Sequence, residues 1–289
     1  MEKVLSTVIS GLLMGGIYAL IAMGLSLQYG VARVLNIAHG EFIMFGAFIT
    51  WVLFSSFGVN PLISLVIVGP VMFIIGFLLY RTLFTSLRIS SANSAAFEGN
   101  SMLATFGLLF IIQNIALQIW SGAMKGYNFL RIGLNIGGAV FEENRLVALG
   151  FAVVIGLGFY LFLARTRMGK AIRAAAQDPA TAGLMGININ RLLALCFGFG
   201  AGLAGIAGVL ISMCNPINAT MGLDYTLIAI VVVVLGGLGS IPGSFIGGFI
   251  LGILGSFVTS YRDPLLSTAA YYVIFMILLL VRPKGILGR

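Results

Sequence analysis

The sequence predicts an all-α polytopic membrane protein with about eight to nine transmembrane helices, two of them interrupted and arranged as an inverted repeat. Hydrophobic residues make up 60% of the 289 positions, and the mean hydropathy of +1.12 exceeds what a soluble domain needs to fill its core. The apolar residues form blocks long enough to cross a hydrocarbon core, which takes about 20 helical residues. Two of the apolar regions are broken by small or polar residues.

The apolar runs follow one another along the chain. Clear runs lie near 4–29, 62–80, 101–120, 146–164, 191–213 and 265–281. Two further regions are less regular, because 31–57 opens with the polar stretch VARVLNIAHGE and 225–260 is split by GGLGSIPG. Counting 31–57 as one segment and 225–260 as two gives nine segments in a single transmembrane domain, 1–289. Eight crossings plus a re-entrant piece is the alternative.

The charged residues predict the orientation of the chain. In the nine-segment arrangement, eleven of the sixteen Lys and Arg residues fall on one side: Arg33, Arg81, Arg88, Arg165, Arg167, Lys170, Arg173, Arg191, Arg282, Lys284 and Arg289. The other side keeps Lys3, Lys125, Arg131, Arg145 and Arg262, balanced by Glu2, Glu142, Glu143, Asp224 and Asp263. An excess of Lys and Arg marks the cytoplasmic side, so we expect the N-terminus outside and the C-terminus in the cytoplasm. Because the basic residues sit at the ends of apolar runs rather than in one patch, nucleic-acid binding is not expected.

The two irregular regions occupy matching places in two halves of the chain. Each follows a Gly-rich span, 11–24 or 198–210, and each resumes as an apolar run, FIMFGAFI or SFIGGFILG. Paired interrupted segments indicate a transport pathway, because unwound backbone survives at membrane depth only where protein or a wet cavity surrounds it. The alternative, close helix packing, fits the pairs with G-x-x-x-G spacing: Gly11 and Gly15, Gly198 and Gly202, and Gly248 and Gly252.

These breaks supply the candidate residues for a translocation pathway or gate. They are Asn36, His39 and Glu41 in the first break, and Gly237, Gly239, Ser240, Pro242 and Gly243 in the second. Polar groups at membrane depth usually face a cavity, whereas a short juxtamembrane turn is the alternative for the first break. Proton coupling through the only histidine is disfavoured, because the clear spans carry almost no further acids. Other candidate pathway residues are Tyr18, Gln113 and Asn114, for which interhelical hydrogen bonds are the alternative.

A polar island at 165–191, RTRMGKAIRAAAQDPATAGLMGININR, separates two long apolar blocks and is expected to face the cytoplasm. Within it, Asp178 is a good helix N-cap, and Pro179 suits the first helical position. Gly186 suits the left-handed residue that ends a helix. The residues between them predict a short helix of about two turns.

Three blocks of the sequence resemble one family of membrane proteins. The block GLLMGGIYALIAMGLSLQYGVARVLNIAHGEFIMFGAF looks like the N-terminal signature of the permease subunits of branched-chain amino acid ABC importers, the LivH/LivM family. RMGKAIRAAAQDPATAGLMGININRLLALCFGFGAGLAGIAGVL and VVVVLGGLGSIPGSFIGGFILG are similar to the central and C-terminal blocks of the same family. The resemblance covers about residues 8 to 285 in order, and the short length favours a LivH-like member. Residues 85–100 and 121–145 follow no pattern of the family.

The resemblance implies that the polar island at 165–191 is a cytoplasmic coupling loop that docks on an ATPase. The residues expected to couple are Asp178, Pro179, Ala180, Ala182, Gly183, Leu184, Met185 and Gly186. Small Ala180, Ala182 and Gly183 would allow close approach, with Leu184 and Met185 as apolar contacts. A well-capped loop helix that binds nothing is the alternative.

The resemblance also implies the partners. They are a second, LivM-like permease in a heterodimer, two LivG/LivF-like ATPase subunits that bind ATP and Mg²⁺, an extracytoplasmic amino-acid-binding protein, and membrane lipid. This chain is expected to bind no cofactor and no metal and to be no enzyme, since it lacks the G-x-x-x-x-G-K-[ST], H-E-x-x-H and G-x-S-x-G motifs.

The function that follows is import of branched-chain or related amino acids through a bacterial or archaeal plasma (inner) membrane. A permease for urea, short amides or other amino acids is one alternative. A secondary carrier that works alone is another, because inverted repeats also occur in such carriers. A membrane scaffold or receptor subunit is disfavoured by the lack of a large extramembrane segment.

Overall fold

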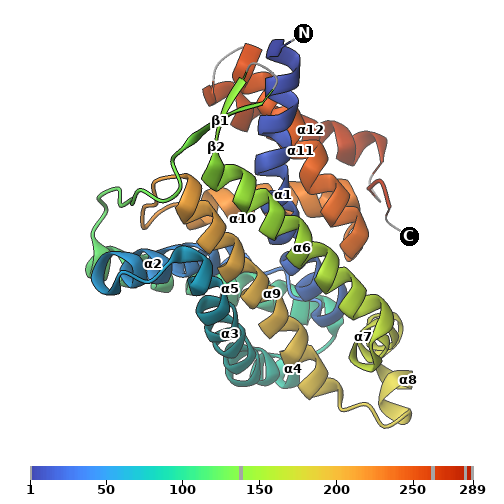
Figure 1. The fold of residues 1–289 in the computed structure, drawn as a ribbon. Helices are drawn as coiled ribbons and strands as arrows, with labels where there is room; N and C mark the ends of the chain where they lie inside the picture. Colours follow the sequence, from blue (N-terminus) through green and yellow to red (C-terminus); the bar gives the residue numbers. More distant parts are fainter. Residues whose placement is uncertain (1, 137–138, 262–263, 283–284, 288–289) are drawn as a thin grey trace.

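The chain folds almost entirely as helices in a computed structural model, which confirms the predicted fold class (Figure 1). The structure describes residues 2–136, 139–261, 264–282 and 285–287. Four charged residues used to predict the orientation, Arg262, Asp263, Lys284 and Arg289, lie outside the described residues. Seven of the described helices are long and apolar enough to cross a membrane, and two shorter apolar helices accompany them.

The elements are, in chain order, α1 (Glu2–Ala32), α2 (His39–Phe57), α3 (Pro61–Leu79), the π-helix η1 (Tyr80–Phe84), α4 (Thr85–Ser90), α5 (Ser94–Trp120), β1 (Gly133–Ile136), β2 (Ala139–Glu142), α6 (Glu143–Arg165), α7 (Arg167–Gln177), α8 (Pro179–Leu184), α9 (Ile189–Cys214), α10 (Gly222–Gly236), α11 (Ile241–Tyr261) and α12 (Pro264–Val281). All six clear apolar runs of the sequence coincide with helices. Region 31–57 contains a break followed by α2, and region 225–260 contains two helices, α10 and α11, as predicted.

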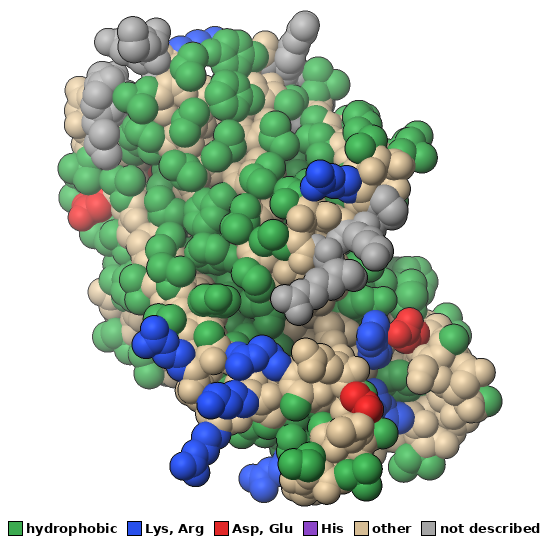
Figure 2. All heavy atoms as spheres, turned by 90° about the vertical axis from the view of Figure 1, so that its right-hand side faces the viewer, with side chains coloured by type: hydrophobic (Ala, Val, Ile, Leu, Met, Phe, Trp, Pro, Cys, Tyr) green, Lys and Arg blue, Asp and Glu red, His purple; other side chains and the backbone are tan. Residues whose placement is uncertain are grey.

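The ends of the molecule differ in character. The N-terminus and the antiparallel β1–β2 pair lie at the upper end in Figure 1, and α7 and α8 lie at the lower end. Strands β1 and β2 fall within 121–145, the stretch for which the sequence predicted no element. In Figure 2, hydrophobic side chains cover most of the upper face, and Lys and Arg side chains gather towards the lower end. This distribution is what a membrane protein with one basic end requires.

Helices α1, α9 and α11 form the centre of the fold through glycine contacts. A Cβ added to Gly15 of α1 would lie 2.8 Å from the Cα of Phe249 of α11, and one added to Gly24 would lie 2.8 Å from the carbonyl oxygen of Gly200 of α9. Gly11 and Gly252 share the α1–α11 contact. The pairs with G-x-x-x-G spacing therefore serve close backbone packing, which was the alternative to a pathway role.

Helices α1 and α9 run antiparallel. Gly24 contacts Gly200, and four residues further along α1, Gln28 donates from its Nε2 to the carbonyl oxygen of Phe197, 3.1 Å away. Each of these helices is followed by a return loop and a second helix, α2 after α1 and α10 after α9. Because the two helix pairs run in opposite directions, they form the inverted arrangement that the sequence predicted.

The pairing of the two breaks differs from the prediction. The counterpart of the first break is the loop 215–221 before α10, whereas the turn 237–240 lies at the opposite end of α10. There, a Cβ added to Gly30, near the C-terminal end of α1, would lie 2.8 Å from the Cα of Gly239. The turn therefore joins α10 to α11 near the basic end of the molecule and does not interrupt a span at depth.

Candidate functional site

The N-terminal ends of α2 and α10 meet in the interior of the protein. The backbone N–H of Gly40 donates to the Thr226 hydroxyl at 2.7 Å, and both residues are buried. The carbonyl of Gly222 leaves no room for a side chain at Gly40, and the Glu41 carboxylate leaves none at Gly222. We call this contact, made by residues 36–41 and 222–226, the helix junction. It joins the two halves of the inverted arrangement at their shared centre.

Glu41 is the buried charged residue of the helix junction. Its side chain is fully buried, and among the described residues neither carboxylate oxygen has a hydrogen-bond partner. The carboxylate lies against Gly222, the first residue of α10. A helix N-terminus carries partial positive charge, which favours a carboxylate at this position, whereas burial without hydrogen bonds disfavours it. Separation of α2 from α10 would give this carboxylate access to water.

His39 ties the start of α2 to α1. Its Nε2 lies 3.1 Å from the carbonyl oxygen of Ile21, and because a carbonyl only accepts, this nitrogen carries the proton. The imidazole is fully buried over Gly24, where an added Cβ would lie 3.2 Å from its Cε1. A side chain at Gly24 would therefore displace the ring from its position.

Asn36 holds the return loop in the protein interior. Its Nδ2 donates to Oε1 of Gln28 at 3.2 Å, and its Oδ1 accepts from the backbone N–H of Ala38 at 3.1 Å. Gln28 in turn donates to the Phe197 carbonyl, so the network joins α1, the loop and α9. The backbone N–H of Ile37 donates to the Thr105 hydroxyl of α5 at 3.2 Å. Irregular backbone within the protein is thus satisfied by side chains, as burial requires.

The structure brings only part of the predicted pathway set together. Asn36, His39 and Glu41 belong to the helix junction, and Tyr18 packs on α12 with its ring edge to face with Tyr271, 6.4 Å between centroids. Gln113 is half-buried on α5. Asn114 is exposed there and donates to the Phe110 carbonyl of its own helix at 2.8 Å.

The predicted residues of the second break line a different space. Gly239, Ser240 and Pro242 border a cavity of about 820 Å³ together with residues of α1, α6 and α7, among them Ile172 and Arg173. Gly237 and Gly243 lie at the same turn, where Gly243 packs on Gly236 and Gly237 on Gly285. We find no contact between this turn and the helix junction, because the whole of α10 separates them.

Sequence reasoning missed three residues of α10. Gly222 and Thr226 complete the helix junction, and Asp224, two residues from each, is exposed on the opposite face of α10. Asp224, Ile228 and Val231 line a small cavity of about 190 Å³ with Tyr271 and Tyr272 of α12. The signal available in the sequence was the polar stretch NPINATMG before α10, which resembles the first break in being short and polar within an apolar region.

The short helix α8 begins and ends at the capping residues that the sequence predicted. Oδ1 of Asp178 accepts from the backbone N–H groups of Ala180 at 2.9 Å and Thr181 at 3.2 Å, and Pro179 is the first helical residue. Gly186 has a φ of +83°, the left-handed conformation that ends a helix. The Thr181 hydroxyl also donates to the carboxylate, and these hydrogen bonds lower the pKa of Asp178. Asp178 therefore remains a charged cap at neutral pH.

Two apolar side chains project from the end of α8 into the surroundings. Leu184 is 88% exposed and Met185 is 80% exposed, while Ala180 and Gly183 are exposed beside them. The expectation for Ala182 is wrong, because its side chain is 4% exposed and faces the rest of the chain. Ala182 thus anchors the helix to its own protein and cannot provide close approach for a partner.

Helix α7 is fixed rigidly to the end of α6. The Thr166 hydroxyl accepts from the backbone N–H of Gly169 at 3.0 Å, which caps α7, and donates to the Phe162 carbonyl at 2.7 Å. Gly169 packs so closely on Leu163 that a side chain would collide with its backbone, and the Arg173 guanidinium donates to the Leu163 carbonyl. We call this corner, residues 162–173, the α6–α7 elbow.

Cavities flank α7 on two sides. One is the cavity of about 820 Å³ between α1, α6, α7 and the turn 237–242. The other, of about 490 Å³, lies between the end of α7 and the α4–α5 connection, and includes Arg33, Arg88 and Glu98. Arg88 donates to the Ala32 carbonyl at the end of α1 at 3.0 Å and lies 4.7 Å from the centre of the Phe97 ring. Helix α7 is therefore fixed to α6 at the elbow, packs into the core through the buried Ala175, and borders a cavity on each side.

Comparison with known proteins identifies relatives along almost the whole chain. A family model for the permease component of branched-chain amino acid transport systems matches residues 7–282. The permease protein BraD of a high-affinity branched-chain amino acid transport system of Pseudomonas aeruginosa is 31% identical over 304 residues, covering 99% of this chain and 96% of that protein. The corresponding LivH protein of Escherichia coli (strain K12) is 32% identical over 300 residues, with the same coverage of 99% and 96%.

An archaeal relative extends the comparison. A probable LivH permease protein of Methanocaldococcus jannaschii is 29% identical over 284 residues, covering 93% of this chain and 88% of that protein. No solved structure matches the chain.

Proposed function

This chain belongs to the family of permease components of branched-chain amino acid transport systems, and from that membership we propose that it is the membrane-spanning subunit of an ATP-driven importer of branched-chain amino acids. Leucine, isoleucine and valine are the proposed substrates, because the relatives that span nearly the whole chain are named for this transport. The observation that carries the ATP-driven mechanism is α8, a short capped helix with two exposed apolar side chains at the basic end.

Helix α8 is the proposed docking element for a separate ATPase subunit. Leu184 and Met185 would enter an apolar depression on that partner, since two side chains of this size left in water favour burial by about 25 cal/mol per Å². Asp178 and Gly186 fix the two ends of the helix and so orient both side chains. ATP and Mg²⁺ would be bound by the ATPase subunits, and this chain would supply no catalytic residue.

The α6–α7 elbow would carry motion of α8 into the membrane. Because Gly169 and Arg173 lock α7 on Leu163, a displacement of α8 turns α7 and the end of α6 together. The two cavities beside α7 give it room to turn without breaking the packed core. Helix α6 packs on α1 through Gly16, where an added Cβ would lie 2.8 Å from Leu149. The movement would therefore reach α1 and the start of α2.

The helix junction is the proposed gate. Its glycine contacts keep α2 and α10 together, and Glu41 is buried in it without a hydrogen bond. A small separation of the helices would hydrate the carboxylate, which lowers the cost of opening. The face of α10 with Asp224, Ile228 and Val231, on which Asp224 is exposed and Val231 is buried, is the proposed wall of the pathway. Its carboxylate suits an α-amino group, and its apolar residues suit a branched side chain.

We propose that the complex contains further subunits. A pathway along this face of α10 needs a second permease, LivM-like, to close it. Two ATPases and an extracytoplasmic amino-acid-binding protein would complete the importer. The chain would cross a bacterial or archaeal plasma (inner) membrane many times, with its N-terminus outside and its basic end in the cytoplasm.

Replacement of Gly186 by Val tests the coupling role. A β-branched residue is strained at a φ of +83°, so the end of α8 should change course and displace Leu184 and Met185. We expect ATP hydrolysis to continue while leucine uptake by the reconstituted complex falls by at least about tenfold, equivalent to about 1.4 kcal/mol. Gly99→Ala is the control, because Gly99 is exposed on α5, outside α8, and nothing lies within 4 Å of an added Cβ there. Full uptake by the Gly186 variant would refute the coupling role of α8.

A further inference from the structure

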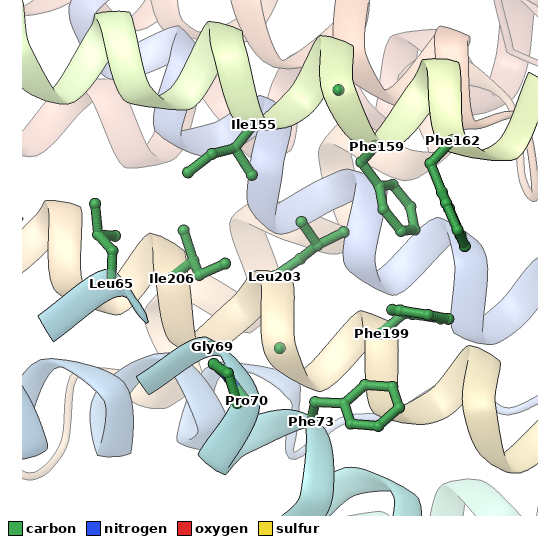
Figure 3. Close-up of a pocket in the computed structure, with 12 residues that line it drawn as sticks. Leu65, Gly69, Pro70, Phe73, Ile155, Phe159, Phe162, Phe199, Leu203 and Ile206 are labelled. Carbon is green, nitrogen blue, oxygen red and sulfur yellow. The ribbon is translucent and has the colours of Figure 1, made fainter. Parts of the chain in front are cut away.

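An apolar groove runs between α3, α6 and α9, away from the helix junction (Figure 3). It has a volume of about 510 Å³. Its walls consist of Leu65 and Phe73 on α3, Ile155 and Phe162 on α6, and Phe199 and Ile206 on α9, with other apolar residues and glycines between them. Figure 3 shows these side chains pointing into the space between the three helices. The lining contains no charged side chain.

One end of the groove is aromatic. The Phe199 ring lies 5.0 Å from the Phe73 ring and 5.4 Å from the Phe162 ring, between centroids, so one ring from each helix meets there. Phe73 also stacks on Phe77, one turn further along α3, at 6.3 Å. The aliphatic end, with Leu65 and Ile206, lies about 12 Å away, eight residues of α3 at 1.5 Å each. This length is close to half of a hydrocarbon core about 30 Å thick.

An arginine follows the aromatic end on each of the three helices. Arg165 ends α6 three residues after Phe162, and Arg191 lies two turns before Phe199 on the same face of α9. Arg81 lies beyond Phe77, with its guanidinium carbon 5.8 Å from the centre of that ring. All three side chains are exposed, and within the described part of the chain none of them is in an ion pair. Each of the three helices thus carries a cation beyond the aromatic end of the groove.

We propose that this groove binds an anionic phospholipid, with one acyl chain between α3, α6 and α9 and the phosphate at Arg81, Arg165 and Arg191. Basic residues beside a cleft between membrane-spanning helices are suited to anionic headgroups, and guanidinium groups bind phosphate with charge-assisted hydrogen bonds. The half-core length fits a single leaflet. The groove also borders the surface that faces the bilayer, since Val66 of α3 is 74% exposed and Val154 of α6 is 69% exposed.

A lipid in this groove would affect how α6 and α7 are held. Its headgroup would lie beside Arg165, directly before the α6–α7 elbow, and its acyl chain would hold α6 against α9. An anionic lipid should therefore stabilise the arrangement of α6 and α7 independently of any ATPase.

Native mass spectrometry of the purified full-length chain tests the proposal, with phosphatidylglycerol compared with phosphatidylcholine of the same acyl chains. We expect the chain to retain one phosphatidylglycerol at least about tenfold more tightly than phosphatidylcholine, the difference expected from charge-assisted hydrogen bonds. Gly158→Leu would fill the groove, because nothing lies within 4 Å of an added Cβ there. It should abolish this binding. Gly150→Leu is the matched control on α6, because it has equal space outside the groove and should bind lipid normally.

A second pair of variants tests the headgroup site. Arg165→Gln should lower phosphatidylglycerol binding about tenfold and leave phosphatidylcholine unchanged. Arg131→Gln, which removes an exposed cation from the loop near the opposite end, should change neither. Equal binding of the two lipids, or unchanged binding in Gly158→Leu, would refute the site. Conversion of an oligomer to a monomer by Gly158→Leu, without loss of lipid, would assign the groove to a second protein chain and also overturn the proposal.

Discussion

The carbonyl of Gly222 occupies the space that a side chain on Gly40 would need, and the Glu41 carboxylate occupies the space that a side chain on Gly222 would need. Gly40 and Gly222 are far apart in the sequence, yet each lies in the first turn of a helix, α2 or α10, that begins inside the protein. The contact joins the two inverted halves of the fold. It is supported by the hydrogen bond from Gly40 to Thr226 and by the Glu41 carboxylate against Gly222.

Gly40→Ala should therefore damage both stability and transport. A methyl group at this contact forces α2 and α10 apart, and overpacking of this kind costs about 1–3 kcal/mol of unfolding free energy. Thermal unfolding of the purified chain in detergent measures the first effect, and leucine uptake measures the second. Gly107→Ala is the control, because nothing lies within 4 Å of an added Cβ at that position on α5. Equal melting temperatures for the Gly40 variant and the native chain would show that the two helices do not meet as described.

Asn36 and Gln28 should behave as a coupled pair. Asn36→Ala leaves the Gln28 Oε1 atom and the Ala38 N–H without their partners in the interior, at a cost of about 1–3 kcal/mol each. Gln28→Ala breaks the same bond from the other side. The double variant should be less destabilised than the sum of the single variants, by at least about 0.5 kcal/mol. A double-mutant cycle of chemical unfolding measures this difference, and strict additivity would contradict the network.

Leu184→Asp should weaken the association with the ATPase subunit. The side chain is almost fully exposed in this chain alone, so the substitution should leave the melting temperature unchanged. A charge placed in an apolar contact should reduce co-purification of the ATPase by at least about tenfold. Leu134→Asp, on β1 at the opposite end, is the matched control and should retain the partner. Normal co-purification with the Leu184 variant would exclude α8 from the contact.

Gly169→Ala should separate ATPase binding from transport. The added methyl group collides with the backbone of Leu163 and moves α7 away from α6, while α8 keeps its own caps. We expect the ATPase to remain bound and leucine uptake to fall about tenfold or more, because the elbow no longer transmits movement. Uptake and co-purification are measured on the same preparation. If both were normal, the elbow would not be the route of coupling.

The local features of the chain were predictable from sequence, and the long-range contacts were not. Asp178, Pro179 and Gly186 were assigned correctly because capping depends on residues within one turn of each other. The apolar runs located the helices because each must present about 20 apolar residues to the membrane. The exposure of Ala182 was predicted wrongly, because the rest of this chain decides which face of the six-residue helix α8 is buried.

The position of the second break shows the limit of sequence reasoning most clearly. GGLGSIPG contains four glycines where NPINATMG contains one, so it is the stronger turn signal, and it does form a turn at 237–240. The weaker signal, NPINATMG, precedes the helix that enters the interior. Only packing decides between them, because Gly222 is paired with Gly40 by the antiparallel arrangement of α1 and α9 rather than by nearby residues. For the same reason, the sequence placed Asp224 on the outer side but gave it no role in the site.

Branched-chain amino acids should cross the membrane through this chain only when a partner supplies the energy of ATP. Uptake of radioactive leucine is measured with proteoliposomes that contain the tagged chain, either alone or with the subunits that co-purify with it. We expect ATP-dependent uptake by the complex, competed by isoleucine and valine, and none by the chain alone. Leucine movement down its gradient through the isolated chain, without ATP, would contradict it.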